Sequence, residues 1–286
     1  MYYSKEYFRE LAPSIRMSPE ALSALEKLMP AFTPEEADTL ARYIMDSAVP
    51  MADKKEKMTA LSQKENGDLL CVLIYMTAAG YLHEKYKEMG MPDSVFADSM
   101  NCLPEKMETH MKHFGTWGYG APTWPLSHLN LTLFRIGRLG YAFVPGPHEP
   151  LMADGKVLVA EDEPYIYMHI SDNEKLVGCA ESIKAAREFF RTFYPEYADC
   201  VYMTNTWLID PKLGEILLPA SNIVQFQKLF HVYDRYDCRS EVLKRVFGVE
   251  KENLDEYVPA TSLARTVLDA LKSGNELGRG IGYTIF

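Results

Sequence analysis

The chain has 286 residues and a net charge of −10, and 47% of its residues are hydrophobic while 24% are charged. This balance is typical of a soluble globular protein with one large or two ordinary domains. The 30 basic residues form no stripe or basic domain that would neutralise phosphates, so the composition argues against a nucleic-acid partner.

Three further features exclude other classes of protein. The longest apolar run, Leu69–Met76, is too short to span a bilayer, so we expect no membrane partner. The first residues, Met1–Glu6, lack the basic start and apolar block of a signal peptide, which predicts a cytoplasmic protein. The five cysteines are scattered without a C-x-x-C motif, which predicts reduced thiols and no metal site.

Residues 1 to about 112 follow the pattern of helices. Ser18 and Pro19 form a helix start, because serine caps and proline fits the first helical position. Thr33 and Glu36 have the spacing of a capping box. Asp68 is expected to cap a longer helix that covers residues 69–88. Two more helices are expected to start at Pro92 and Pro104.

The segment Gly115–Pro125 is rich in glycine, proline and tryptophan, which predicts a joint between a domain of residues 1–125 and a domain of residues 126–286. Strands and helices then alternate, so we expect an α+β protein in which a helical N-terminal domain precedes a mixed β-sheet flanked by helices. The expected strands are 131–144, 156–159, 165–170, 200–209 and 280–286, and the expected helices are 182–194, 221–230 and 263–271.

The most informative segment is the connection between the strand that ends at Ile170 and the helix that begins at about Glu181. Its residues 175–180 read Lys-Leu-Val-Gly-Cys-Ala. Gly178 and Ala180 let the backbone approach a ligand closely. The unpaired amides and the dipole of the helix start favour an anion there. The segment therefore predicts a diphosphate site, although an ordinary strand–helix loop has the same composition.

This segment resembles the Arg/Gln-x-x-Gly-x-Gly/Ala motif of GNAT acyltransferases, with Lys175 in place of the arginine or glutamine. The chain as a whole resembles bacterial acyltransferase domain-containing proteins, which join a helical N-terminal domain to a GNAT-like C-terminal domain. The resemblance runs in order from about residue 90 to residue 223, and its segments are 90–96, 113–124, 133–139, 168–170, 207–213 and 218–223.

The resemblance implies a mechanism. In GNAT enzymes two parallel strands, here 165–170 and 201–209, diverge at their ends, and the pantetheine arm of acyl-CoA lies between them. An amine attacks the thioester carbonyl directly, and a backbone N–H stabilises the oxyanion, which can contribute about 3 kcal/mol. The implied co-substrate is acyl-CoA, with acetyl-CoA as the first expectation, and the implied acceptor is a small-molecule amine or a peptide. The implied cofactor-binding residues are Met168, Ile170, Lys175, Leu176, Val177, Gly178, Cys179, Ala180 and Asn222.

Three residues are candidates for proton transfer. His169 suits a base because imidazole titrates near neutrality, although it could be a hydrogen-bonded core residue. Glu163 could act through water, or it could belong to a solvated turn with its acidic neighbours. In GNAT enzymes a tyrosine on the helix after the fifth strand protonates the leaving thiolate. Leu229 occupies that position here, which leaves Tyr233 as a candidate acid or a packing residue.

Our leading interpretation is therefore an acyl-CoA-dependent N-acyltransferase. The missing tyrosine keeps open the alternative of a non-catalytic protein that binds coenzyme A or another small molecule. A third interpretation retains only the fold, with side chains filling the gap between the two strands. The sequence predicts neither the acyl chain length nor the oligomeric state.

Overall fold

The computed structural model describes residues 1–171 and 174–285. Contacts within the chain divide it into two compact units, Met1–Gly140 and Tyr141–Phe286. The predicted final strand extended to Phe286, which lies outside the described residues. No helix in the described part of the chain is long and apolar enough to cross a membrane.

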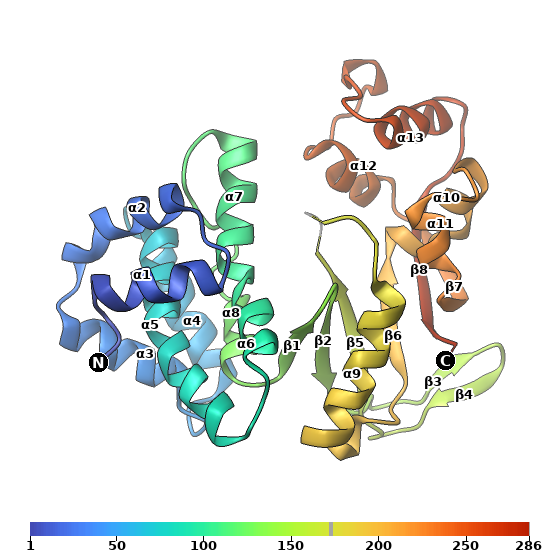
Figure 1. The fold of residues 1–286 in the computed structure, drawn as a ribbon. Coiled ribbons are helices and arrows are strands. Elements are labelled where there is room, and N and C mark those ends of the chain that lie inside the picture. Colours follow the sequence, from blue (N-terminus) through green and yellow to red (C-terminus); the bar gives the residue numbers. More distant parts are fainter. Residues whose placement is uncertain (172–173, 286) are drawn as a thin grey trace. The chain divides into compact units, whose positions relative to one another are not determined.

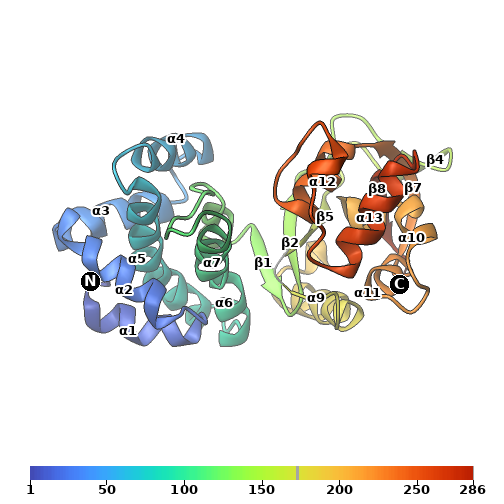
Figure 2. The ribbon, with the colours of Figure 1, turned by 90° about the horizontal axis from the view of Figure 1, so that it is seen from above.

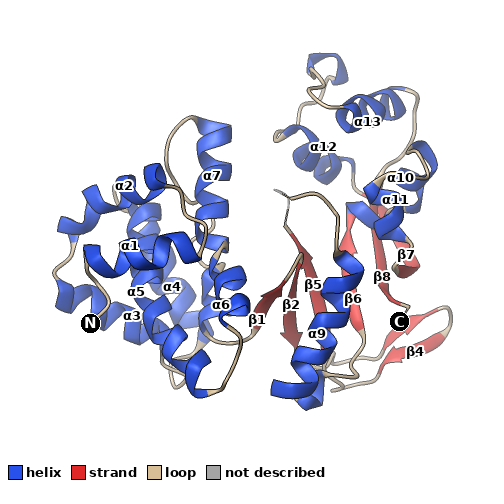
Figure 3. Ribbon diagram, viewed as in Figure 1, coloured by secondary structure: helices blue, strands red, loops and turns tan. Residues whose placement is uncertain are grey.

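Unit 1 consists mainly of helices (Figures 1 and 3). Its last helix is followed by the short strand β1 (Leu133–Ile136). The segment Gly115–Pro125, predicted as the domain joint, connects α7 to α8. The helices are α1 (Lys5–Ser14), α2 (Pro19–Leu28), α3 (Pro34–Met45), α4 (Met51–Ser62), α5 (Gly67–Glu88), α6 (Asp93–Met100), α7 (Cys102–Phe114) and α8 (Pro125–Leu129), with a 3-10 turn at Met29–Ala31.

Helix α5 forms the centre of unit 1 (Figure 2). Its residues from Leu69 to Met76 are all buried, as expected for a helix that is apolar on every side. The other helices of the unit pack around it, and α3 and α4 both contact it. The longest apolar run of the sequence is thus the buried core of unit 1.

Two of the predicted helix starts are confirmed in detail. The Ser18 hydroxyl accepts a hydrogen bond from Ala21 N–H at 3.3 Å. Thr33 and Glu36 form the predicted capping box, in which each side chain accepts from the backbone N–H of the other. The predicted cap at Asp68 is wrong, because its carboxylate instead accepts from the distant Gly120 N–H at 3.1 Å.

Unit 2 contains most of the sheet and the remaining helices (Figure 3). The six-stranded sheet has the order β1-β2-β5-β6-β8-β7, and β3 and β4 form a separate hairpin. Strands β5 and β6 are parallel, whereas β8 runs antiparallel to both β6 and β7, so the predicted mixed sheet and α+β class are confirmed. The strands are β2 (Leu139–Val144), β3 (Leu151–Ala153), β4 (Lys156–Val159), β5 (Tyr165–Ile170), β6 (Tyr202–Thr206), β7 (Phe230–Asp237) and β8 (Gly278–Thr284).

Helix α9 (Cys179–Phe193) lies along one face of this sheet (Figure 1). Its buried Phe190 ring lies 6.2 Å from the ring of Tyr141 on β2 and 6.3 Å from that of Tyr202 on β6. The buried side of this helix is therefore its contact with the sheet. The other helices of the unit are α10 (Pro211–Ile216), α11 (Asn222–Gln227), α12 (Arg239–Phe247) and α13 (Ser262–Lys272).

The strand expected over 280–286 is β8, which starts at Gly278 and includes three alternating glycines, Gly278, Gly280 and Gly282. Gly280 is required by close approach, because a Cβ there would lie 2.4 Å from the carbonyl oxygen of Ile209. The alternating glycines thus give β8 one flat face on which the turn after β6 can lie.

Three sequence predictions need correction in unit 2. Strand β6 ends at Thr206 rather than at residue 209, because the Thr206 hydroxyl accepts from Leu208 N–H and starts a 3-10 turn. Helix α11 ends at Gln227, and the segment that includes Tyr233 is strand β7 rather than part of a helix. Helices α10 and α12 of this unit were not predicted, and neither were α1, α4 and α8 of unit 1.

Candidate functional site

Strands β5 and β6 pair over only part of their length. Ile166 N–H donates to the Val201 carbonyl at 2.9 Å, and the register pairs are Ile166 with Tyr202 and Tyr167 with Met203. Pairing ends there, although both strands continue in the described part of the chain, to Ile170 and Thr206. The strands therefore separate toward their carboxyl ends.

Helix α9 begins near the carboxyl end of β5. Gly178 precedes it with φ 74°, and this capping position carries no side chain. A Cβ at Gly178 would meet no atom within 4 Å, so the left-handed backbone rather than lack of space requires glycine. The first amides of a helix have no partner within the helix, and its dipole favours an anion beside them. This helix start has the properties of a diphosphate site.

The predicted cofactor-binding residues of the loop differ in exposure. Lys175, Val177 and Gly178 are exposed, whereas Leu176 and Ala180 are half-buried. Val177 has 63% of its surface exposed, and its N–H donates to the Lys175 carbonyl at 2.9 Å. Cys179 is buried, so its side chain is not exposed to a ligand.

His169 lies on β5, in the part of the strand beyond its pairing with β6. Its ring is 5.0 Å from that of Tyr167, which projects from the same face of the strand. Burial lowers the pKa of His169 from 6.5 to about 4, so the imidazole is neutral at physiological pH. A neutral imidazole can accept a hydrogen bond there, but it is a weak base.

The structure does not bring the other predicted residues to the same place. Glu163 lies before the start of β5, at the end away from Gly178, and its carboxylate accepts from Ala160 N–H at 2.8 Å. Tyr233 is half-buried on β7, where burial, Asp234 and Tyr165 raise its pKa. Asn222 is exposed at the first position of α11, next to Ser221, which caps that helix as predicted.

Residues 133–284 match the family model of the GNAT-like C-terminal domain, and residues 6–131 match that of the N-acyltransferase N-terminal domain. The chain belongs to the GNAT-like C-terminal domain family. The resemblance inferred from the sequence motifs is confirmed by these matches. None of the curated proteins matches the chain.

Solved acyltransferases share the fold of both parts of the chain. One, in complex with decanoyl-CoA and teicoplanin, is 22% identical, with a TM-score of 0.74 over 98% of this chain and 87% of that chain. Another, a mutant in complex with octanoyl-CoA, is 21% identical with the same TM-score and coverage. A third, in complex with CoA and 10C-teicoplanin, is 20% identical, with a TM-score of 0.65 over 97% of this chain and 98% of that chain.

Sequence reasoning missed a group of polar contacts in the GNAT-like domain, where β5 and β6 separate. The carbonyl of Met168 accepts from the Thr204 hydroxyl at 3.1 Å. The carbonyl of Asn205 accepts from the Tyr167 hydroxyl at 3.2 Å and also from the Arg279 guanidinium. No sequence signal could have identified these residues, because the contacts depend on the register of strands that are distant in the chain.

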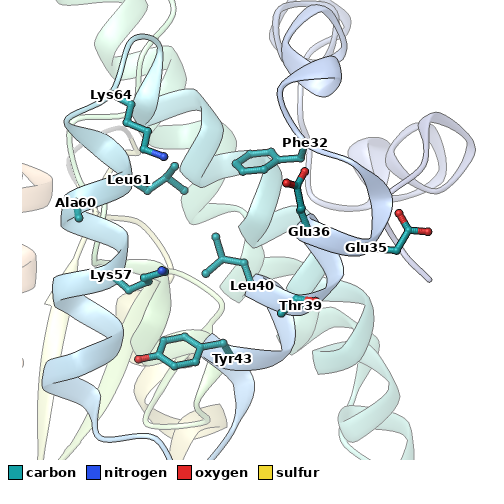
Figure 4. Close-up of a pocket in the computed structure, with 10 residues that line it drawn as sticks. All are labelled: Phe32, Glu35, Glu36, Thr39, Leu40, Tyr43, Lys57, Ala60, Leu61 and Lys64. Atoms are coloured by element: carbon teal, nitrogen blue, oxygen red, sulfur yellow. The ribbon is translucent and has the colours of Figure 1, made fainter.

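Unit 1 contains a pocket of about 730 Å³ between α3 and α4 (Figure 4). Apolar side chains from both helices lie between two glutamates of α3 and two lysines, Lys57 of α4 and Lys64 just after it. None of the residues predicted for acyl transfer lines it. The lining residues are Phe32, Glu35, Glu36, Thr39, Leu40, Tyr43, Lys57, Ala60, Leu61 and Lys64.

Proposed function

We propose that this protein is an acyl-CoA-dependent N-acyltransferase that transfers an acyl group directly to an amine, and that residues 126–286 carry the reaction. The observation that supports this most strongly is the separation of β5 and β6 next to the start of α9, where Gly178 has a positive φ. The two features together provide a slot for a pantetheine arm and an anion site for its diphosphate.

The chain's own groups have distinct roles in this proposal. The backbone of Met168 and Ile170 lines the slot, and the segment from Lys175 to Ala180 binds the diphosphate through its amides and through the Lys175 ammonium group. The co-substrate supplies the acyl group as a thioester. A small-molecule amine or a peptide is the acceptor, and Asn222 remains a proposed contact of either substrate.

We propose an acyl chain longer than acetyl. The similar solved acyltransferases bind decanoyl-CoA and octanoyl-CoA, and two of them also bind teicoplanin or a teicoplanin derivative. Octanoyl- and decanoyl-CoA are therefore the first donors to compare with acetyl-CoA, and a glycopeptide amine belongs in the first acceptor panel.

His169 is the proposed proton acceptor because it lies where β5 leaves β6. Its low pKa keeps the imidazole unprotonated at pH 7, which is the form that can receive a proton. Glu163 and Tyr233 lie on other parts of unit 2 and remain weaker candidates for the base acting through water and for the acid.

The second candidate function is non-catalytic binding of an acyl-CoA. It is favoured by the absence of any tyrosine from residue 207 to residue 229, which includes the usual position of the leaving-group acid. Binding of acyl-CoA without thiol release in the presence of amines would favour this function, and thiol release that depends on an amine would exclude it.

The test is a calorimetric titration of the full chain with acetyl-, octanoyl- and decanoyl-CoA, repeated on Gly178→Ala. An alanine at positive φ costs roughly 1–2 kcal/mol, so the backbone at the start of α9 should shift and binding should weaken about tenfold. Gly155→Ala is the matched control, because Gly155 also has positive φ, 76°, and open space around it, on the β3–β4 hairpin.

Both variants should lose similar stability, but only Gly178→Ala should lose affinity. If the parent protein bound none of the three thioesters, the acyltransferase proposal would be abandoned. If Gly178→Ala and Gly155→Ala bound acyl-CoA with equal affinity, the diphosphate would not bind at the start of α9.

A further inference from the structure

Where β5 and β6 separate, two backbone carbonyl groups accept hydrogen bonds from side chains and not from the neighbouring strand. In a regular parallel ladder the register of Tyr167 with Met203 would continue two residues further. The carbonyl of Met168 would then accept from Asn205 N–H, and the carbonyl of Asn205 would accept from Ile170 N–H. These two bonds would close the gap between the strands.

Side chains satisfy both of these carbonyl groups instead. The Thr204 hydroxyl donates to Met168 at 3.1 Å, and Thr204 is buried. The Tyr167 hydroxyl donates to Asn205 at 3.2 Å, and the Arg279 guanidinium donates to the same carbonyl oxygen. Each acceptor that the closed ladder would use is therefore already occupied.

Arg279 is itself held in place. Its guanidinium donates to the Glu241 carboxylate of α12 at 2.5 Å, and Glu241 also pairs with Arg245 at 3.5 Å. The side chains of Arg279 and Glu241 are largely buried, with 23% and 19% exposed, so this ion pair is less screened than a surface pair. Helix α12 is thus connected to the separated strands through a fixed charged contact.

We propose that Thr204, Tyr167 and Arg279 are positioning residues that hold β5 and β6 apart, so that the slot is open before any ligand enters it. This inference rests on the proposed function, because the slot is the site assigned to the pantetheine arm. The three side chains form what we call the brace. They donate hydrogen bonds to the carbonyl groups of Met168 and Asn205, so the strands gain little free energy by pairing there. A slot that is already open spares acyl-CoA the cost of breaking two backbone hydrogen bonds.

Removing the two hydroxyl donors frees the Met168 carbonyl and leaves the Asn205 carbonyl with the Arg279 contact alone, which should favour closing of the strands. Tyr167→Phe and Thr204→Val each delete one hydroxyl with little change of shape, and the double variant deletes both. A hydrogen bond of this kind contributes about 1 kcal/mol, so each single variant should weaken decanoyl-CoA binding about fivefold and the double variant more than tenfold. The affinity is measured by calorimetry on the full chain.

Two control variants separate positioning from general structural effects. Tyr165 lies two residues before Tyr167 on the same face of β5, and its hydroxyl makes no hydrogen bond within the described residues, so Tyr165→Phe should leave binding unchanged. Thr204→Ser keeps the donor and should retain at least half of the parent's affinity.

Hydrogen exchange provides a readout that does not require a ligand. If the strands close in the double variant, the amides of Ile170 and Asn205 should become more protected from exchange than in the parent, whereas a merely destabilised domain would become less protected. Increased protection together with weaker binding supports the brace. Unchanged protection, or affinity equal to that of Tyr165→Phe, overturns it. If the parent binds no acyl-CoA, the proposed function fails, and the exchange data alone decide whether the brace exists.

Discussion

At the scale of single residues, His169 shows how its place on a strand changes the chemistry of a side chain. The sequence indicated a group that titrates near neutrality, whereas burial lowers its pKa to about 4. Its value as a base therefore depends on being unprotonated throughout the physiological range, and not on a pKa matched to that range.

This shift predicts a specific dependence of stability on pH. The folded-state pKa, about 4, lies below the ordinary value of 6.5, so the unfolded chain binds the proton more readily. The stabilising contribution is complete above pH 6.5 and is lost as the pH falls from 6.5 to 4, by at most about 3 kcal/mol. Urea unfolding at a series of pH values should show a smaller loss in His169→Gln than in the parent. Parallel curves for the two proteins would contradict the shift.

At the scale of elements, Asp210 connects the turn after β6 to the last two strands. Its buried carboxylate accepts from the Arg235 guanidinium of β7 at 3.0 Å and from the Gly278 N–H of β8 at 2.6 Å. It also accepts from Lys212 N–H at 3.2 Å, at the start of α10. One carboxylate thus fixes three elements that lie far apart in the sequence.

We predict that Asp210→Asn lowers the free energy of unfolding by about 2–3 kcal/mol, because it removes the buried one of the two carboxylates that pair with the partly buried Arg235 guanidinium. Asp237→Asn is the matched control. Asp237 pairs with the same guanidinium at 2.7 Å, but half of its side chain is exposed, so its loss should cost less than about 1 kcal/mol. Chemical denaturation measures the free energy of unfolding of both variants. Equal losses in the two variants would show that the burial of Asp210 does not increase its contribution to stability.

The elements also show what sequence can predict. The capping box of Thr33 and Glu36 was correct because all of its groups lie within one helical turn. The helix expected over 182–194 was found as α9 because helical periodicity is local. Strand β7, which contains Tyr233, was not predicted, because it is defined by its pairing with β8, which begins more than forty residues later in the sequence.

The residues of the candidate site also fall into two groups, those that the sequence could predict and those that it could not. The loop around Gly178 could be predicted because a strand, a glycine and a helix follow one another in the chain. Thr204 and Arg279 could not, because their roles arise only when β5, β6 and β8 lie side by side. No periodicity or spacing specifies that register.

At the scale of the whole molecule, the net charge of −10 has a consequence for an anionic substrate. Acyl-CoA approaching the protein is repelled at long range, and salt screens this repulsion. We predict that the association rate constant of decanoyl-CoA, measured by stopped-flow, increases between about 0.05 and 0.5 M salt. A rate constant that decreased with salt would show that the exposed Lys175 and nearby cations dominate the approach.

The order of the strands in the sheet has a consequence for synthesis of the chain. Strand β8 lies between β6 and β7, although both of these precede it in the sequence. The ribosome adds roughly 5–20 residues per second, so several seconds pass between the emergence of Thr206 and that of Gly278. During that interval β6 and β7 each expose an edge that only β8 can cover, and open strand edges promote aggregation. A nascent chain stalled before residue 278 should therefore be a preferred client of the chaperones that shield such edges.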